Sequence, residues 1–506
     1  MGSKLLVRGY NVGCGDCFYV RIPNGENDDF HMLIDCGSKE GASSGVMERA
    51  IRDLADNTLP DAQEPGKKRL DLIVVTHRHE DHIKGFDRDF FHDIAIGNIW
   101  LTAAMNENHP QATRSLALHR LAAGQMRSLA ASGAALSPEL LDLVALYGIS
   151  NTGATEALTK TLPDANGIEP TYVFAGQSSD DFGIEIENTK IHVLAPEEDI
   201  DHFYLGKEAD ENLRGLLSTA GEFRVLAAKD ADRAEMDDFY RGGEATADAD
   251  RMLAEAESFA DRAASAGETR PANITNSDFR TLRSRMLSNG LAFAVNDSKI
   301  QNNVSTVLLI EWGTKRLLFV GDAEWEEEFR EGKKNGSWNV MWHQRRALLD
   351  KPIDFLKVGH HGSHNATPWN RHAGADQEVN QIFDAILPLP ANGEEPTAQC
   401  VVSTKRKQYD TIPDAELLTE LAKRVKNTQT YLTEFQQQDP NFDPDEDIFN
   451  YSVMKTYSKQ PSPREVGEKG FLERPQPLRT DMESEGKGLE KMVDKVEFVE
   501  VLVAPD

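Results

Sequence analysis

Cysteines and long apolar runs are scarce in this sequence. Only four cysteines occur among 506 residues, too few for a disulfide framework at this length. Cys14 and Cys17 have C-x-x-C spacing, but no second pair completes a four-cysteine metal site, so we expect a tight turn with buried thiols. No run of about 18 apolar residues occurs, and residues 1–8 lack the apolar core of a signal peptide. We therefore expect a cytoplasmic protein that is not associated with a membrane.

Basic residues are also few relative to acidic ones. The chain has 84 Asp and Glu against 55 Lys and Arg, a formal net charge of −29. Such a surface repels long duplex DNA and acidic membranes unless positive charge is concentrated locally. Lys405–Lys407 is the best local basic cluster, and it either holds a phosphate or forms a solvated turn. Hydrophobic residues make up 39%, which is enough for a globular core.

The length suits one large domain with insertions. The segment after residue 197 is rich in Ala, Glu and Asp at helical spacing, and residues 458–490 resemble a linker because prolines and glycines recur there. We divide the chain into core segments 1–105, 165–197 and 291–428, a helical insertion at 106–164, an acidic helical insertion at 198–290, and a C-terminal extension at 429–506. The acidic insertion is either a soluble spacer, a lid or a docking surface for a protein partner.

Apolar, β-branched runs bounded by turn residues predict a series of strands. These lie at 5–7, 18–22, 31–34, 70–75, 99–102, 172–174, 191–194, 305–310, 316–320, 353–358, 400–403 and 495–503. Helical spacing predicts helices at 46–56, two within 112–146, one that starts at Gly321 and runs to 330, and one at 413–425. The alternation of strands and helices favours an α/β fold.

Three histidines and an aspartate crowd into six positions directly after the strand at 70–75. Their order is His77, His79, Asp81 and His82. Imidazole and carboxylate groups are common metal ligands, so this H-x-H-x-D-H cluster can hold two adjacent divalent ions. We expect His77 and His79 to bind one ion, and Asp81 and His82 to bind the second.

Other predicted strands also end in candidate ligands. Asp35 follows the strand at 31–34, Asp322 follows the strand at 316–320, and His360 and His361 follow the strand at 353–358. Strand ends at one edge of a sheet are where α/β scaffolds place their sites. We expect Asp322 to bridge two ions, one of the paired histidines to be a terminal ligand, and Asp35 to orient a ligand histidine. Of the pair we favour His360, because it comes immediately after the strand.

These motifs, in this order, resemble the metallo-β-lactamase superfamily, and more narrowly the soluble hydrolase domain of ComEC-type competence proteins. The stretches that carry the resemblance are 11–16, 33–37, 75–82, 302–306, 319–324 and 356–363. The resemblance implies an αββα sandwich and a hydrolase site with one or two zinc ions, or manganese. The ComEC membrane channel has no counterpart here, so the resemblance does not extend to DNA uptake.

The sequence departs from the family pattern at two places. Superfamily members often carry a further metal-binding histidine between the cluster and the bridging aspartate, and the candidates here are His192, in mid-strand, and His109, in a loop. ComEC-like domains usually have a Tyr-Gly-His-Pro-like segment after the last core strand. Here Gln408–Pro413 replaces it and keeps only Tyr409. We assign catalytic roles to Asp81, Asp35 and Tyr409.

The leading functional hypothesis is a phosphodiesterase or nuclease-type hydrolase in which a metal-bound hydroxide attacks phosphorus. The acidic charge favours a phosphorylated small molecule, a nucleotide or a short single-stranded nucleic acid as substrate. Two alternatives stay open. One is a lactone, ester or amide hydrolase with the same metal site, and the other is a metal-stabilised subunit of a multiprotein assembly, such as a defence system.

Overall fold

The computed structural model describes most of the predicted core. The described residues are 4–39, 45–131, 152–206, 294–370, 372–391, 394–404, 412–414, 417, 420–421, 423–426, 476–477 and 498–505. Most of the acidic insertion, the linker-like stretch 458–490 except residues 476–477, the Lys405–Lys407 cluster and Tyr409 therefore lie outside the described residues.

Two β-sheets form the centre of the fold. Among the described residues, the first has seven strands in the order β13-β1-β2-β3-β4-β5-β6, and the second has six in the order β12-β11-β10-β9-β8-β7. The strands of the first sheet are β1 (Leu5–Tyr10), β2 (Phe18–Ile22), β3 (Phe30–Ile34), β4 (Lys68–Val75), β5 (Ile94–Thr102), β6 (Thr171–Val173) and β13 (Phe498–Val503). Those of the second are β7 (Thr189–Ala195), β8 (Val307–Trp312), β9 (Lys315–Phe319), β10 (Phe355–Lys357), β11 (Gln399–Val402) and β12 (Gln476–Pro477).

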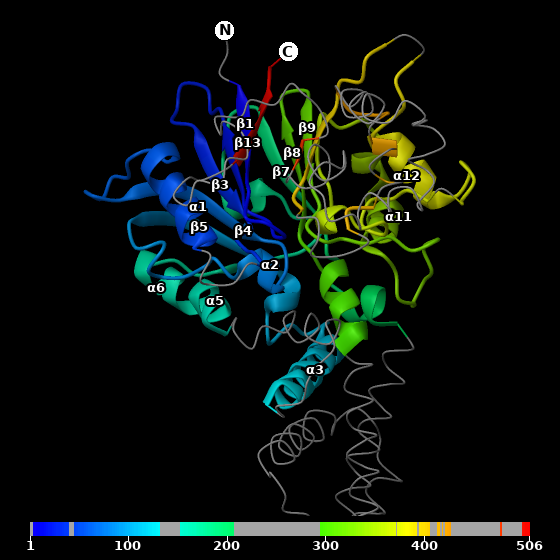
Figure 1. Cartoon of the computed structure of the whole chain (residues 1–506), viewed down its shortest axis with the longest axis horizontal. Coiled ribbons are helices and arrows are strands. Elements are labelled where there is room, and N and C mark those ends of the chain that lie inside the picture. The colour runs from blue at the N-terminus through cyan, green and yellow to red at the C-terminus, as the bar shows by residue number, and fades with distance from the viewer. Residues whose placement is uncertain are drawn as a thin grey trace, which may run out of the picture.

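Helices cover the outer faces of both sheets (Figure 1). The helices are α1 (Val46–Asp53), α2 (Glu80–Ile83), α3 (Thr113–Ala131), α5 (Thr152–Glu156), α6 (Leu162–Asn166), α11 (Ser337–Leu349) and α12 (Glu378–Ile386). Helices α1, α5 and α6 lie on the side of the first sheet, and α11 and α12 lie on the side of the second (Figure 1). This mixed α/β arrangement of two sheets between helices is the αββα class that the sequence predicts.

Alternation along the strands explains why four layers form. In β4, Leu72 and Val74 join the core between the sheets with Phe319 of β9. Their neighbours Ile73 and Val75 point to the other face and pack with residues of α1. Because successive side chains of a strand point to opposite faces, an uninterrupted apolar strand must be covered on both sides.

The strands that precede the candidate ligands run parallel to one another within each sheet. In the first sheet β3 pairs in parallel with β4. In the second, β9 pairs in parallel with β10. The carboxyl ends of parallel strands lie at the same edge of a sheet, so the topology brings Asp35 beside the His77–His82 cluster, and Asp322 beside the two adjacent histidines.

The C-terminal strand returns to the beginning of the chain. β13 pairs antiparallel with β1, with Leu5 opposite Val503. The buried Arg8 of β1 donates to Glu500 of β13, with a distance of 2.8 Å from Nε to Oε1. The predicted terminal strand is therefore confirmed, and it covers one edge of β1 that would otherwise expose unpaired backbone groups.

One predicted helix is wrong. Residues 321–330 contain no helix, and the next helix begins only at Ser337. The backbone N–H of Glu324 donates to Asn303 Oδ1 at 3.2 Å, and that of Glu326 donates to Asn339 Oδ1 at 2.7 Å. A helix that starts at Gly321 would bond the N–H of Glu326 internally, so its tertiary partner Asn339 competes with the helix and overrides the helical propensity of this acidic stretch.

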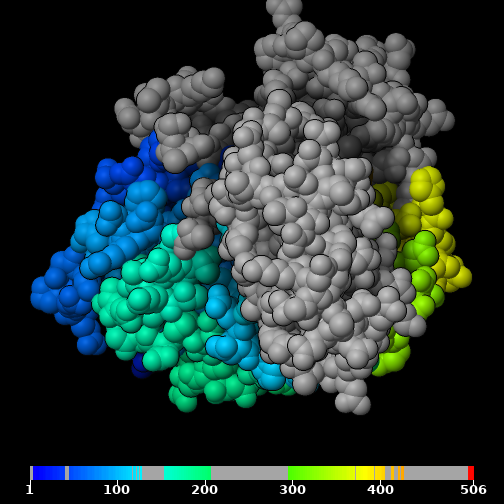
Figure 2. Space-filling view, turned by 90° about the horizontal axis from the view of Figure 1, so that it is seen from below, coloured from blue at the N-terminus to red at the C-terminus, as the bar shows by residue number. Residues whose placement is uncertain are grey.

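The candidate ligands come from two parts of the chain, one near the N-terminus and one after residue 294. Seen from below, the blue segments near the N-terminus and the green-to-yellow segments that follow residue 294 lie on opposite sides (Figure 2), whereas β13 pairs with β1 in the first sheet. Among the described residues, no helix combines the length and the apolar composition needed to cross a membrane.

Candidate metal centre

Six candidate ligands among the described residues reach the centre from three strand ends, those of β4, β9 and β10. His77 and His79 lie in the loop after β4, and Asp81 and His82 lie on α2, which follows directly. Asp322 and His361 come from the other sheet, in the turns that follow β9 and β10. All six side chains are buried, with exposed fractions between 0 and 4%. Buried imidazoles and carboxylates at such density are uncommon in a core unless they are paired or bind a cation.

Among the described residues three groups of donor atoms can be distinguished: Asp16, Asp35 and His82 form one, and the other two share Asp322. We call these other two the four-residue group and the three-residue group. The four-residue group contains Asp81, His82, Asp322 and His361, and the three-residue group contains His77, His79 and Asp322. The donor atoms within each group lie within 4.8 Å of one another. The spacing of the cluster predicts the same division, with His77 and His79 on one side and Asp81 and His82 on the other.

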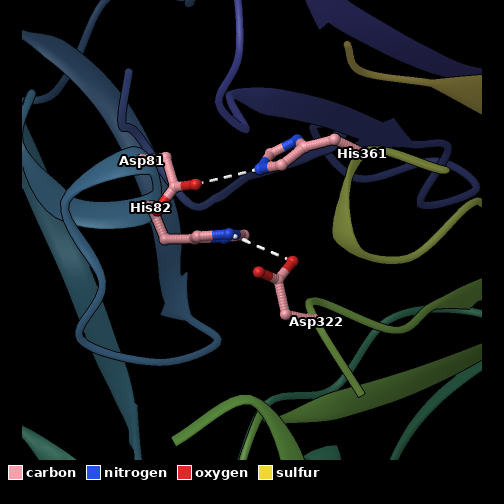
Figure 3. Close-up of side chains that lie close together, drawn as sticks. All are labelled: Asp81, His82, Asp322 and His361. Carbon is pink, nitrogen blue, oxygen red and sulfur yellow. Dashed lines mark hydrogen bonds and ion pairs between the residues drawn. The ribbon is translucent and has the colours of Figure 1, made fainter. Parts of the chain in front are cut away.

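The four-residue group joins the two sheets (Figure 3). His361 Nε2 lies 3.0 Å from Asp81 Oδ2, and His82 Nε2 lies 3.2 Å from Asp322 Oδ1. Asp81 and His82 come from the first sheet, whereas Asp322 and His361 come from the second. Neither sheet alone could form this group.

Asp322 belongs to both groups because its two oxygens face different histidines. Its Oδ1 faces His82, and its Oδ2 lies 3.6 Å from His77 Nε2. A carboxylate that presents one oxygen to each of two neighbouring donor sets has the geometry of a bridging ligand. The bridging role itself remains a prediction.

Several donor atoms at this centre have no hydrogen-bond partner. Asp81 Oδ1, His82 Nε2 and both carboxylate oxygens of Asp322 are buried without one. A buried carboxylate oxygen that lacks a hydrogen bond is costly, and coordination of a cation removes that cost. The donor set therefore fits one or two divalent cations.

Groups behind the ligands determine which ring nitrogen faces the centre. Asp35 Oδ2 accepts a hydrogen bond from His82 Nδ1 at 2.7 Å, and Asp35 Oδ1 accepts one from the backbone N–H of Thr76, also at 2.7 Å. His361 Nδ1 similarly donates to the carbonyl oxygen of Ser403 at 2.8 Å. In both histidines Nε2 is thus left to face the centre, as in metal sites where a carboxylate or carbonyl holds the ligand tautomer.

Two further buried groups at the centre were not anticipated from the sequence. Asp16 forms an ion pair with the fully buried Lys357 and accepts a hydrogen bond from the Ser403 hydroxyl. Lys357 Nζ also donates to the carbonyl oxygen of Gly321, directly before Asp322. A lysine inside the apolar stretch 353–358 was the available signal, since a buried lysine needs a specific partner.

Burial and neighbouring charges shift the pKa values of these histidines in opposite directions. Burial lowers the pKa of His77 well below its usual value and lowers that of His79 to about 4. Burial would also lower the pKa of His82, but the carboxylates of Asp322 and Asp35 outweigh it and raise that pKa well above the usual value. The three-residue group thus presents neutral imidazoles, the form that binds metals, whereas a cation at the four-residue group must displace a proton.

The two adjacent histidines after β10 face different neighbours. His361 Nε2 faces Asp81, whereas His360 Nε2 lies 3.8 Å from Asp322 Oδ2 and belongs to neither donor group. Both residues have left-handed backbone conformations, with φ of 42° and 54°. This unusual turn directs the second ring inward, so the geometry favours His361, contrary to the preference for His360 drawn from chain order.

The weaker histidine candidates lie elsewhere. His192 on β7 has Nε2 3.1 Å from Glu311 Oε2 on the neighbouring strand, and His109 Nδ1 accepts a hydrogen bond from the backbone N–H of Gln111. Neither belongs to a donor group among the described residues. Cys14 and Cys17 are buried and unbridged, as expected, and they too lie outside these groups. The three-residue group therefore has two histidines and one shared carboxylate.

Comparison with known families agrees with this geometry. Residues 11–88 match the family model of the metallo-beta-lactamase superfamily. The match includes Asp35 and the whole His77–His82 cluster, and the two-sheet fold with outer helices is consistent with that superfamily. No curated protein matches the chain. Because the superfamily consists mostly of metal-dependent hydrolases, the match and the His/Asp cluster together support a metal-dependent hydrolase that uses divalent metal.

Proposed function

We propose that this protein is a phosphodiesterase with two zinc ions, or manganese ions, at the centre, and that it acts on a nucleotide, another phosphorylated small molecule or a short single strand. The observation that carries the proposal is the position of Asp322, whose two oxygens face the two donor groups. Two cations a few ångströms apart suit phosphodiesters, because they contact both the attacking and the leaving oxygen of an in-line displacement.

Each residue has a defined part in this proposal. His77 and His79 would hold one ion, Asp81, His82 and His361 the other, and Asp322 both. When bound, divalent cations make water a better nucleophile at neutral pH and neutralise charge on the phosphoryl group. Asp35 keeps His82 Nε2 directed at the centre, and Asp16 with Lys357 holds the backbone just before Asp322 in place.

The two donor groups differ in how much of a cation they enclose. The three-residue group offers three donors, one fewer than a closed tetrahedral site, so its remaining position suits a water or a substrate oxygen. The net charge of −29 limits the substrate to small or short anions, because long duplex DNA would be repelled. The resemblance to the hydrolase domain of ComEC-type proteins also favours a phosphodiester, and a cytoplasmic location is part of the same proposal.

A substrate screen on the purified, metal-loaded protein tests this function. We expect bis-p-nitrophenyl phosphate or a short single-stranded DNA to be cleaved, and lactones and carboxylic esters to be left intact. Asp322→Asn should abolish cleavage, whereas Asp61→Asn should not, because that carboxylate is exposed and pairs at the surface with Lys68. Cleavage confined to lactones or esters would show that the protein is a lactone or ester hydrolase instead. Full phosphodiester activity in Asp322→Asn would also reject the proposal.

A further inference from the structure

A lysine lies beside the candidate ligands and has no part in the family motifs. Lys39 Nζ is 3.1 Å from Asp81 Oδ2, the oxygen that also faces His361. The Lys39 side chain is 14% exposed, so it lies between the buried carboxylates and solvent. Burial is the main cause of the lowered pKa values of His79 and His360, and the charge of Lys39 contributes to them in the same direction.

The backbone around Lys39 is held in place. The N–H of Lys39 donates to the carbonyl oxygen of Cys14 at 2.8 Å, and the N–H of Gly37 donates to that of Asp16 at 2.9 Å. The Ser38 hydroxyl donates to the carbonyl oxygen of Val12 at 2.5 Å. The Gly-rich turn of the N-terminal motif therefore positions this lysine, whereas most surface lysines have a flexible attachment. A fixed ammonium loses less entropy when it binds a ligand.

A cation at the four-residue group changes the charge balance around Lys39. Asp81 would then share its negative charge with the cation, so the ammonium would face a centre with excess positive charge. An anion bound at the same place relieves that repulsion, and it contacts the lysine through a charge-assisted hydrogen bond. A neutral lactone or ester carbonyl carries no negative charge, so it would not relieve the repulsion between the cation and the Lys39 ammonium.

We propose that Lys39 binds a non-bridging phosphate oxygen of the substrate at the open side of the metal centre. The inference rests on the proposed function and names the anchor that would make this site select phosphate. It assigns Lys39 to substrate binding and not to metal binding, because lysine carries no acceptor atom when protonated.

Phosphate binding to the metal-loaded protein measures this role directly. We expect Lys39→Met to retain the metal content of the wild type, by elemental analysis, but to bind inorganic phosphate about tenfold more weakly in calorimetry, as for one lost hydrogen bond to a charged group. Lys39→Arg should retain most of the affinity because it keeps the charge. Acetate should bind weakly to the wild type and to both variants, because a monoanionic carboxylate offers fewer and weaker acceptors than phosphate.

Lys84→Met is the matched control. Lys84 lies four residues after Glu80, on the next turn beyond α2, and pairs with that carboxylate. The Lys84→Met variant should bind phosphate as the wild type does. Unchanged phosphate affinity in Lys39→Met would overturn the inference, and so would a loss of metal in both Lys39 variants, since Lys39 would then support the ligands. If Lys39-dependent phosphate binding persists but no phosphodiester is cleaved, only the proposed function fails.

Discussion

The two sheets contribute to the centre in different ways. The first sheet supplies four donors from one segment of six residues, His77 to His82, which lies at the end of a single strand. The second sheet supplies Asp322 and His361, which follow two different strands and are separated by helix α11. A local cluster can be present without a complete fold, whereas the second contribution depends on correct packing of the sandwich.

The donor groups built from these contributions also differ. The four-residue group has two carboxylates and two imidazoles, whereas the three-residue group has only the shared carboxylate of Asp322 with its two imidazoles. More donors and more negative charge give tighter binding of a divalent cation. We therefore expect a firmly held ion at the four-residue group and a more exchangeable ion at the three-residue group.

The largest effect should come from changing Asp322, the residue that the four-residue and three-residue groups share. Asp322→Asn takes the carboxylate charge from both groups at once, so we expect loss of the ion at the three-residue group, which keeps two donors, and weaker binding at the four-residue group, which keeps three. Activity should fall by more than roughly a hundredfold, because changes even to groups behind the ligands cost about 10–100-fold. Elemental analysis and phosphodiester turnover measure the two effects. An Asp322→Asn protein with two tightly bound ions would show that the groups do not share this residue.

An intermediate effect should separate the two groups. His77→Ala leaves the three-residue group with two donors, so we expect it to lose one ion outright. His361→Ala leaves three donors in the other group, so its ion should bind more than roughly 100-fold more weakly but remain at high metal concentration, because changes to groups behind the ligands already cost about 10–100-fold. Titration with Zn²⁺ followed by calorimetry distinguishes the two results.

The adjacent histidine provides the control for this pair. His360 belongs to neither donor group, so His360→Ala should keep both ions and lose less affinity than His361→Ala. If His360→Ala loses an ion while His361→Ala does not, the chain-order preference was right and the geometric assignment must be reversed.

The smallest effect on the centre should come from a buried histidine outside it. His31 on β3 forms a 2.7 Å hydrogen bond with the Tyr19 hydroxyl, and burial, with Arg69 and Arg21 nearby, lowers its pKa from 6.5 to about 4. At His82, by contrast, carboxylates reverse the effect of burial. His31→Gln should therefore leave the metal content unchanged and alter only the pH dependence of stability.

The direction of that pH dependence follows from the lowered pKa. The unfolded chain takes up a proton near pH 6.5, but the folded protein does so only near pH 4, so the free energy of unfolding falls as the pH drops through this window. The loss is at most roughly 3 kcal/mol. Urea unfolding at pH 7 and pH 4.5 should show a smaller drop for His31→Gln than for the wild type. An equal drop in both would mean that His31 does not carry this dependence.

Features that depend on nearby residues were predictable. The apolar run before His77 predicts β4, and two apolar runs joined by the Gly-containing turn 311–315 predict the hairpin of β8 and β9 that precedes Asp322. The helix predicted from Gly321 to 330 was wrong because contacts with residues distant in sequence, and not nearby residues, determine this segment. Its acidic residues have helical propensity, but Asn303 and Asn339, distant in sequence, accept the hydrogen bonds of its backbone.

The sequence by itself therefore determined the ligand types, their order and the strands that end in them, because short-range periodicity and spacing encode these. Only the tertiary structure decided that Asp322 faces both groups, that His361 points inward, and that Asp16 pairs with Lys357. The first needs two sheets in contact, the second needs two consecutive left-handed residues, and the third joins residues more than 300 positions apart. Contacts of this kind have no local signature, since they arise from packing over the whole sandwich.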